Sequence, residues 1–201
     1  MEIILATRNP SKAEQIKNIF LDSPFVIKTL NEAKIEGDVV EDGATLNENA
    51  LKKARYAFNA SGCMKWTMAD DTGLFIDALN GEPGIKAARW AGENATTEDI
   101  MNHCLKCLKV KSDRSATFET VVAIVTPTGN EYFFSGKVHG QLLEYPRVKF
   151  QPGMPYSGLF MPEGDNLTWA EMTVEDENKI SHRGKAFRKA RLFLEKQTVK
   201  D

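Results

Sequence analysis

The chain has 201 residues, of which 42% are hydrophobic, and this is typical of one globular domain, or of one domain with two lobes, around a sizeable core. A formal net charge of −2 excludes a broad surface for nucleic acid polymers, and no apolar run approaches the roughly 20 residues that span a bilayer. Three cysteines without a disulfide framework, and a first segment without a basic leader, indicate a protein of the reducing cytoplasm.

The first half of the chain predicts alternating strands and helices. Apolar runs predict strands at 2–7, 25–30 and 66–70, and helical spacing predicts helices at 11–21 and 45–60. Thr45 and Glu48 have the spacing of a capping box at the start of the second helix. The third strand is expected to end at the adjacent carboxylates Asp70 and Asp71.

The second half predicts a helix, a long hairpin and further helices. A helix opens at Thr96 or Thr97, and the strands of the hairpin lie at 115–126 and 131–143. A Pro- and Gly-rich loop and a short helix near 173–178 precede a final amphipathic helix capped by Ser181. We therefore expect an α/β protein with a mixed central β-sheet flanked by helices. We expect residues 1–201 to form a single domain of two lobes, with the hairpin around 116–140 in the second lobe.

Cys104 and Cys107 form a C-x-x-C that could be a redox pair or half of a metal site. However, Ile100, Cys104, Cys107 and Leu108 fall on one apolar face of the predicted helix. A zinc site needs further ligands, and the chain has no second C-x-x-C. We therefore interpret the cysteines as core residues of a helix.

Polar residues follow the first predicted strand, where it turns into a helix. Thr7, Asn9, Ser11 and Lys12 lie where free backbone N–H groups and the helix dipole favour an anion. This segment is not a P-loop, because the G-x-x-x-x-G-K-[ST] pattern is absent. It suits a polyphosphate, and the alternative is an ordinary capped turn with a surface lysine.

Asp70 and Asp71 follow a later strand, and open α/β sheets bind ligands beyond the carboxyl ends of their strands. Two carboxylates with opposed directions can divide their work, one holding a hard cation and the other deprotonating a water. Glu41, in a loop before a helix, could add a further oxygen ligand. The alternative is a solvated turn in which an aspartate caps the next segment.

A third polar cluster, Ser181, His182, Arg183 and Lys185, opens the final helix. Such side chains can hydrogen-bond a planar base or grip phosphates. Taken alone, this cluster is more simply explained as a basic helix face in water.

Four motifs in order identify a resemblance. They are T-x-N-x-x-K near the start, E-x-G-x-T-x-x-E-N-A-x-x-K-A, A-D-D-T-G-L-x-x-D-A-L-x-G-x-P-G, and S-H-R-G-K-A near the end. The chain resembles the inosine triphosphate pyrophosphatase family over nearly its whole length. The resemblance implies a nucleotide cleft between two lobes, dependence on Mg²⁺, a homodimer, and hydrolysis of deaminated purine nucleoside triphosphates to a monophosphate and pyrophosphate.

The resemblance also implies roles for individual residues. The phosphates would be held by Thr7, Arg8, Asn9, Ser11, Lys12 and Lys53. Glu41 and Asp70 would hold the metal, and Asp71 would be the general base for water. Residues implied to lie against the nucleoside are Thr72, Arg89, His182 and Arg183.

Two departures from the family pattern concern the base. In the loop that packs on the base, Tyr156 keeps an aromatic ring, but Ser157 replaces an aspartate. Glu177 stands where the family has a lysine that recognises a purine 6-oxo group. A carboxylate repels a carbonyl oxygen but accepts from an amine, so we expect relaxed or altered base selectivity. The alternatives are a nucleotide-binding protein with little turnover and a pyrophosphatase for another modified nucleotide.

Overall fold

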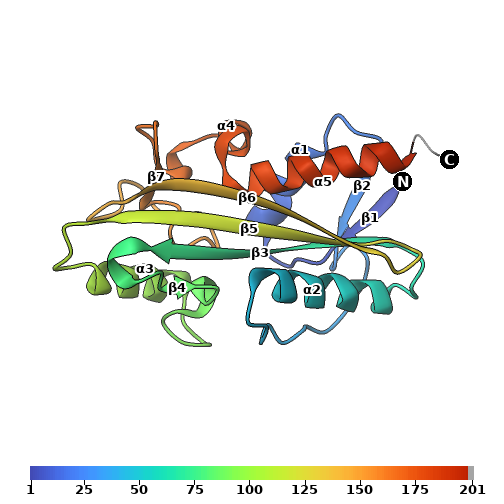
Figure 1. Ribbon diagram of the computed structural model, residues 1–201, viewed down its shortest axis with the longest axis horizontal. Coiled ribbons are helices and arrows are strands. Elements are labelled where there is room, and N and C mark those ends of the chain that lie inside the picture. The colour runs from blue at the N-terminus through green and yellow to red at the C-terminus, as the bar shows by residue number, and fades with distance from the viewer. Residues whose placement is uncertain (199–201) are drawn as a thin grey trace.

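The computed structural model describes residues 1–198, and residues 199–201 lie outside the described part. A long curled sheet runs the length of the molecule with helices on both faces (Figure 1). The strands are β1 Glu2–Leu5, β2 Val26–Thr29, β3 Trp66–Ile76, β4 Pro83–Gly84, β5 Ser115–Val125, β6 Glu131–Leu142 and β7 Phe160–Pro162. The α-helices are α1 Pro10–Ile19, α2 Leu46–Ala60, α3 Thr97–Cys107, α4 Val174–Ile180 and α5 His182–Thr198.

The sheet is mixed, as predicted. Its strand order is β2-β1-β3-β5-β6-β7, with β4 paired to β3. β1 lies parallel to β2 and β3, whereas β3, β5, β6 and β7 are successively antiparallel. The α/β class, the long hairpin and the flanking helices are therefore confirmed.

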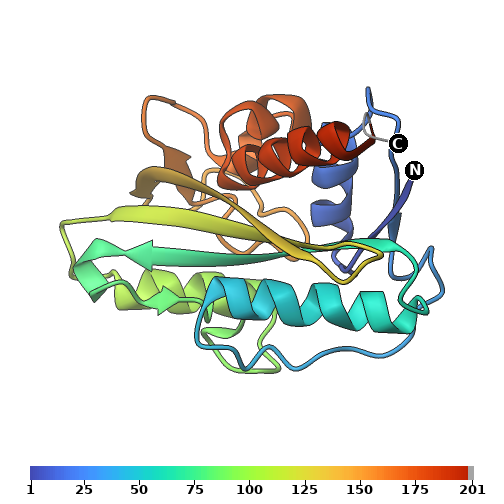
Figure 2. The same ribbon diagram turned by 45° about the vertical axis from the view of Figure 1, so that its right-hand side comes forward.

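Helices cover the sheet on two sides (Figures 1 and 2). α2 packs on one face through a cluster that includes Ala50, Ala54 and Ala57, while α1 and α5 pack on the other through Ile16 and Phe187. A third cluster lies where α3 meets the far ends of β3, β5 and β6. No helix in residues 1–198 combines the length and the apolar character of a membrane span.

The prediction that the third strand ends at the aspartate pair is wrong. β3 continues to Ile76, and the two aspartates lie in its middle, where Asp70 pairs with Val122 and Asp71 with Val121 of β5. The strand that ends there is β1, whose last pair with β3 is Leu5 with Met68. The aspartates therefore stand just beyond the end of β1, on a strand that β5 supports alone.

Local capping signals were predicted well. The Thr45 hydroxyl accepts from the Glu48 backbone N–H at 3.1 Å, and Ser181 Oγ accepts from the backbone N–H of Gly184 at 3.0 Å. The Thr45 box is not closed, however, because the Glu48 carboxylate accepts from the Ala44 N–H instead. A complete capping box opens α3 at Thr96.

The C-x-x-C motif lies on α3, as predicted. Cys104 is fully buried among Ile100 and Leu108, and Cys107 is half-buried with its Sγ 3.5 Å from His103 Nε2. All three cysteines are free thiols. The interpretation as helical core residues holds fully for Cys104 and in part for Cys107.

Candidate active site

The loop between β1 and α1 is fixed by its own polar side chains. Asn9 caps α1, where its Oδ1 accepts from the Lys12 N–H at 3.1 Å. The Asn9 amide also donates to the Gly153 carbonyl, and the Ser11 hydroxyl donates to the Pro152 carbonyl. These two residues tie the first helix to the distant loop around 153. Asn9 and Thr7 still line the cavity that holds Lys12.

Arg8 fastens a neighbouring segment. Its guanidinium donates to Asn31 Oδ1 and to the carbonyls of Ile35 and Gly37, at 2.5–2.9 Å. These contacts hold the chain that leads toward Glu41. Arg8 lines the edge of the same cavity, but its main contacts stabilise the loop.

Asp70 faces the side of the sheet that carries α1 and α5. Its Oδ2 lies 3.2 Å from Lys12 Nζ and 3.5 Å from Arg183 Nε, and its side chain is 1% exposed. Burial alone would raise the pKa of Asp70, but the two cations outweigh burial and hold the pKa well below its usual range. Asp70 is therefore a permanent anion between two cations.

Asp71 faces the opposite side, toward α2, because successive residues of a strand alternate. Its Oδ1 lies 2.8 Å from Lys53 Nζ, and its Oδ2 accepts from Asn49 Nδ2 at 3.4 Å. The same Lys53 Nζ is 3.2 Å from Glu41 Oε1. Two carboxylates thus share one ammonium group.

The charged groups on this side of the sheet shift one another's pKa values. Burial and the neighbouring Glu41 carboxylate raise the pKa of Asp71, although Lys53 opposes the shift. Burial opposes ionisation of Glu41 too, but Lys53 lowers its pKa. For Lys53 the carboxylates outweigh burial and raise its pKa. Asp71 is consequently the more basic of the two carboxylates and the better proton acceptor.

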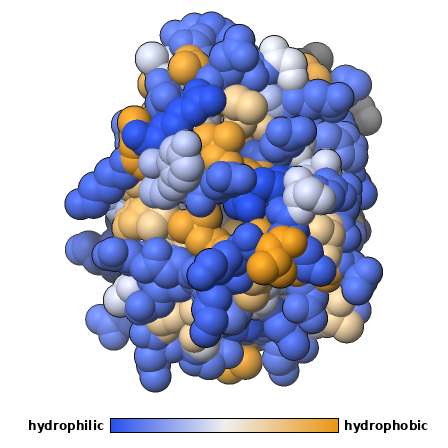
Figure 3. Space-filling model, turned by 90° about the vertical axis from the view of Figure 1, so that its left-hand side faces the viewer, coloured by the Kyte–Doolittle hydropathy of each residue, from blue (hydrophilic) through white to orange (hydrophobic). Residues whose placement is uncertain are grey.

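Two adjoining compartments form the site. The charged compartment gathers Thr7, Asn9, Lys12, Glu41, Lys53 and Asp70. The aromatic compartment is lined by residues that include Thr72, Phe118, Met154, Tyr156, Trp169, Glu177, His182 and Arg183. Lys12, Ala88 and Gly153 border both. The end of the molecule that carries α3 and β7 gathers apolar side chains in its middle, framed by polar ones (Figure 3).

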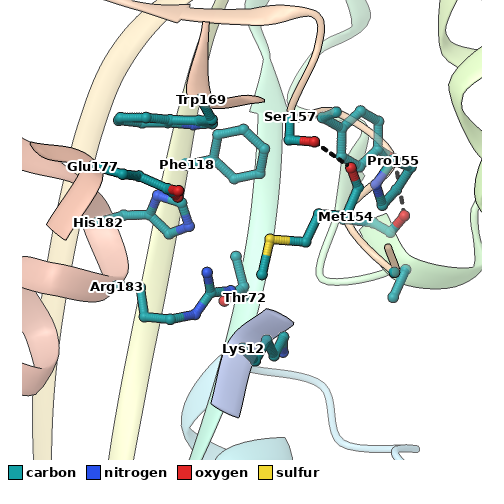
Figure 4. A pocket seen from close by; sticks show the side chains of 14 residues that line it. Lys12, Thr72, Phe118, Met154, Pro155, Ser157, Trp169, Glu177, His182 and Arg183 are labelled. Carbon is teal, nitrogen blue, oxygen red and sulfur yellow. Dashed lines mark hydrogen bonds between the residues drawn. The ribbon is translucent and has the colours of Figure 1, made fainter. Parts of the chain in front are cut away.

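His182 and two other rings build the walls of the aromatic compartment (Figure 4). The imidazole of His182 stacks on Phe118 with centroids 4.7 Å apart and planes 14° apart, and Trp169 lies 6.1 Å away. Burial, with Arg183 beside it, lowers the pKa of His182 well below its ordinary value. His182 is therefore neutral at pH 7 and offers one donor and one acceptor.

The loop residues Tyr156 and Ser157 are held by protein partners. The Tyr156 hydroxyl donates to the Ala87 carbonyl at 2.8 Å, and its buried ring meets the edge of Phe118. Ser157 Oγ donates to the Met154 carbonyl and accepts from the Gln151 N–H. Both residues line the compartment while shaping the loop, and Met154 is the loop side chain that points inward (Figure 4).

Thr72 faces the aromatic compartment, whereas Arg89 contacts the loop that carries Glu41. Thr72 lines the aromatic compartment, with its hydroxyl 2.7 Å from that of Thr120 and 3.4 Å from Asp70 Oδ2. Arg89 donates to the backbone carbonyl of Glu41 at 2.7 Å. It therefore positions the loop of Glu41.

Glu177 reaches the aromatic compartment from α4. It is 2% exposed, and its Oε2 accepts from Gln15 at 2.7 Å and from Gln151 at 3.4 Å. The Oε1 atom of Gln15 in turn accepts from Arg183. Burial raises the pKa of Glu177, although Arg183 opposes the shift.

The sequence did not single out several residues of the site. These are Gln15, Asn49, Phe118, Met154 and Trp169. Phe118 and Trp169 have the pattern of ordinary core residues, and nothing in their local sequence marks them as pocket walls. Asn49 could have been found, because it is a polar residue on the inner face of the predicted second helix.

The carboxylates of the site can hold a divalent cation only if a bound phosphate group supplies further oxygen ligands. Within residues 1–198, no three His, Cys, Asp or Glu side chains are gathered closely enough to hold an ion by themselves. Mg²⁺ bound to phosphate needs only one or two protein carboxylates, and Glu41 and Asp70 line one cavity. The donor set therefore fits Mg²⁺ whose other ligands are phosphate oxygens and water.

Comparison with known proteins agrees on one family. The model of the Ham1 family matches residues 3–193. A dITP/XTP pyrophosphatase of Thermoanaerobacter sp. (strain X514) is 42% identical over 199 residues, which cover 98% of each chain. That of Geobacter sulfurreducens is 39% identical over 188 residues, which cover 92% of each. The Ham1 proteins of Staphylococcus aureus and Coxiella burnetii are 34% identical, with TM-scores of 0.81 and 0.83, and they match 98% of this chain and 100% and 99% of theirs.

Proposed function

Because this chain belongs to the Ham1 family, we propose that it is a nucleoside triphosphate pyrophosphatase that hydrolyses non-standard substrates such as ITP, dITP and XTP. The products are a nucleoside monophosphate and pyrophosphate, and the role is cleansing of the nucleotide pool. One observation carries the proposal: a charged compartment that holds the half-buried Lys12 and Lys53 together with carboxylates adjoins an aromatic compartment of the kind that holds a planar base. The two compartments match the two ends of a nucleotide.

The phosphate end is served by the charged compartment. Lys12 and Lys53 neutralise the charge that develops on the leaving pyrophosphate, and Thr7 and Asn9 lie along the same wall. The guanidinium of Arg183 is buried beside Asp70 and reaches the border between the compartments. Without a ligand these cations are paired with Asp70, Asp71 and Glu41, and a bound phosphate would add a further anionic partner.

We propose that Asp71 accepts the proton of the attacking water. Burial and Glu41 make it basic, and Lys53 and Asn49 fix its two oxygens. Glu41 and Asp70 would hold Mg²⁺. When bound, that ion polarises the scissile phosphoryl group and offsets phosphate charge.

The base end is served by the aromatic compartment. His182 is stacked on Phe118 and neutral, so it can hydrogen-bond a base or sugar without adding charge. Thr72 lies between the base walls and Asp70. We further propose that the protein is a homodimer of the cytoplasm. Each chain would be one domain of two lobes, with the 116–140 hairpin in the second lobe. The three free thiols support a reducing compartment.

The test is a hydrolysis panel. Pyrophosphate release from ITP, XTP, dUTP, GTP and ATP is measured with and without Mg²⁺, with gel filtration of the same sample. We expect Mg²⁺-dependent release from at least one non-standard nucleotide. Binding without release from every nucleotide would overturn the proposal and favour a binding protein with little turnover.

A further inference from the structure

A buried carboxylate stands among the rings of the aromatic compartment. Glu177 comes from α4 and lines the same compartment as His182 and Trp169 (Figure 4). The side chain cannot turn away into water, because the residue is 2% exposed and is held by Gln15 at 2.7 Å. A ligand that fills this compartment therefore meets a fixed carboxylate.

The groups around Glu177 leave one of its carboxylate oxygens as an acceptor for a ligand. Both hydrogen bonds to Glu177 end on Oε2, and within residues 1–198 no hydrogen bond reaches Oε1. The nearest cation, Arg183, is directed to Asp70 and Gln15. Trp169 Nε1 is a buried donor that has no partner in the described chain.

This inventory defines the base edge that fits. A carbonyl oxygen against the Glu177 carboxylate is repulsive and leaves Oε1 without a donor. An exocyclic amine instead donates to Oε1. The pocket thus favours a base whose buried edge carries an amine.

We propose that Glu177 is a specificity-determining residue that makes this chain accept purines with an amine on the buried edge at least as well as purines with a carbonyl there. The inference rests on the proposed function, since it concerns which triphosphates that site takes. It assigns the substrate class as amino-substituted purine nucleoside triphosphates, in addition to the 6-oxo class.

The experiment compares matched nucleotides. ATP and ITP exchange an amine for a carbonyl at C6, and 2-aminopurine and purine riboside triphosphates differ by the amine at C2. The values of kcat/KM are measured for wild type, Glu177→Lys and Glu177→Gln. Glu175→Gln is the control, because Glu175 lies exposed on the same helix and forms an ion pair with Lys179, outside the compartment.

We expect wild type to process at least one amine-bearing nucleotide as well as its partner, or better. In Glu177→Lys the preference moves at least tenfold toward the carbonyl or amine-free partner, which is about 1.4 kcal/mol. Glu177→Gln moves it less, because an amide can both donate and accept. A wild type that prefers ITP over ATP tenfold or more, with ratios unchanged within twofold in both variants, would overturn the inference.

A binding measurement separates this inference from the proposed function. Calorimetry with α,β-imido analogues of ATP and ITP gives their affinities without turnover. If wild type hydrolyses nothing, the proposed function fails, and the affinity ratio still decides the role of Glu177. If ITP is hydrolysed but the amine analogue binds tenfold more weakly in wild type and in Glu177→Gln alike, only the present inference fails.

Discussion

Replacement of Asp71 by asparagine should change the rate of catalysis without lowering the stability of the fold. The side chain keeps its shape and loses its charge. Lys53 keeps Glu41 as a partner at 3.2 Å, and the pKa of Asp71 is raised, which means that folding disfavours its charged form. The free energy of unfolding at pH 7 should therefore stay the same or rise by about 1 kcal/mol.

Catalysis should respond in the opposite direction. A positioned general base contributes ~10²–10⁴-fold, which is about 2.7–5.5 kcal/mol of activation free energy. We expect steady-state pyrophosphate release by Asp71→Asn to fall at least 100-fold, while thermal unfolding shows an unchanged or higher midpoint. The matched control is Asp22→Asn, at an exposed site. A rate within threefold of wild type would refute the role of Asp71 as base, and a fall in rate with a large fall in melting temperature would indicate a structural role.

Three further outcomes are expected. Gly136→Ala should destabilise the fold by about 1–3 kcal/mol, since a Cβ there would lie 2.2 Å from the His182 carbonyl oxygen. Urea unfolding measures the change with Ser135→Ala as the control, and equal urea midpoints for the two variants would contradict this packing. EDTA should abolish turnover and added Mg²⁺ should restore it; activity that survives chelation would exclude the metal. Burial raises the folded-state pKa of Glu177 above 4.5, so stability that is present at lower pH is lost as the pH rises through that pKa. Glu177→Gln should therefore lose less unfolding free energy than wild type between pH 4 and pH 8, and parallel curves of unfolding free energy against pH would contradict this.

Elements with local signals were predictable from the sequence. Helix caps at Thr45 and Thr96, helical apolar spacing in α1–α3, and alternation in the hairpin are all properties of neighbouring residues. The end of β3 was not, because Asp-Asp-Thr-Gly has the composition of a turn while its pairing with β5 is decided far along the chain. The strands β4 and β7 escaped prediction because two or three residues are too few to show an alternating pattern.

The site residues also divide into those that the sequence could predict and those that only the tertiary structure shows. Asp70, Asp71, Lys12 and Lys53 follow recognisable motifs, and the fold brings them together. The walls of the aromatic compartment depend on tertiary packing, because Phe118 on a strand and Trp169 on a 3-10 helix both lie against His182 only in the folded chain. Tyr156, the ring expected at the base, lines the aromatic compartment and is anchored to Ala87 by its hydroxyl.

The most direct test of the account is the identity of the products. Phosphorus NMR of ITP incubated with the protein and Mg²⁺ distinguishes cleavage between the α and β phosphates from removal of the terminal phosphate. The account predicts inosine monophosphate and pyrophosphate in equal amounts, and none from Asp71→Asn over the same time. Inosine diphosphate and inorganic phosphate, or intact ITP that is only bound, would contradict it.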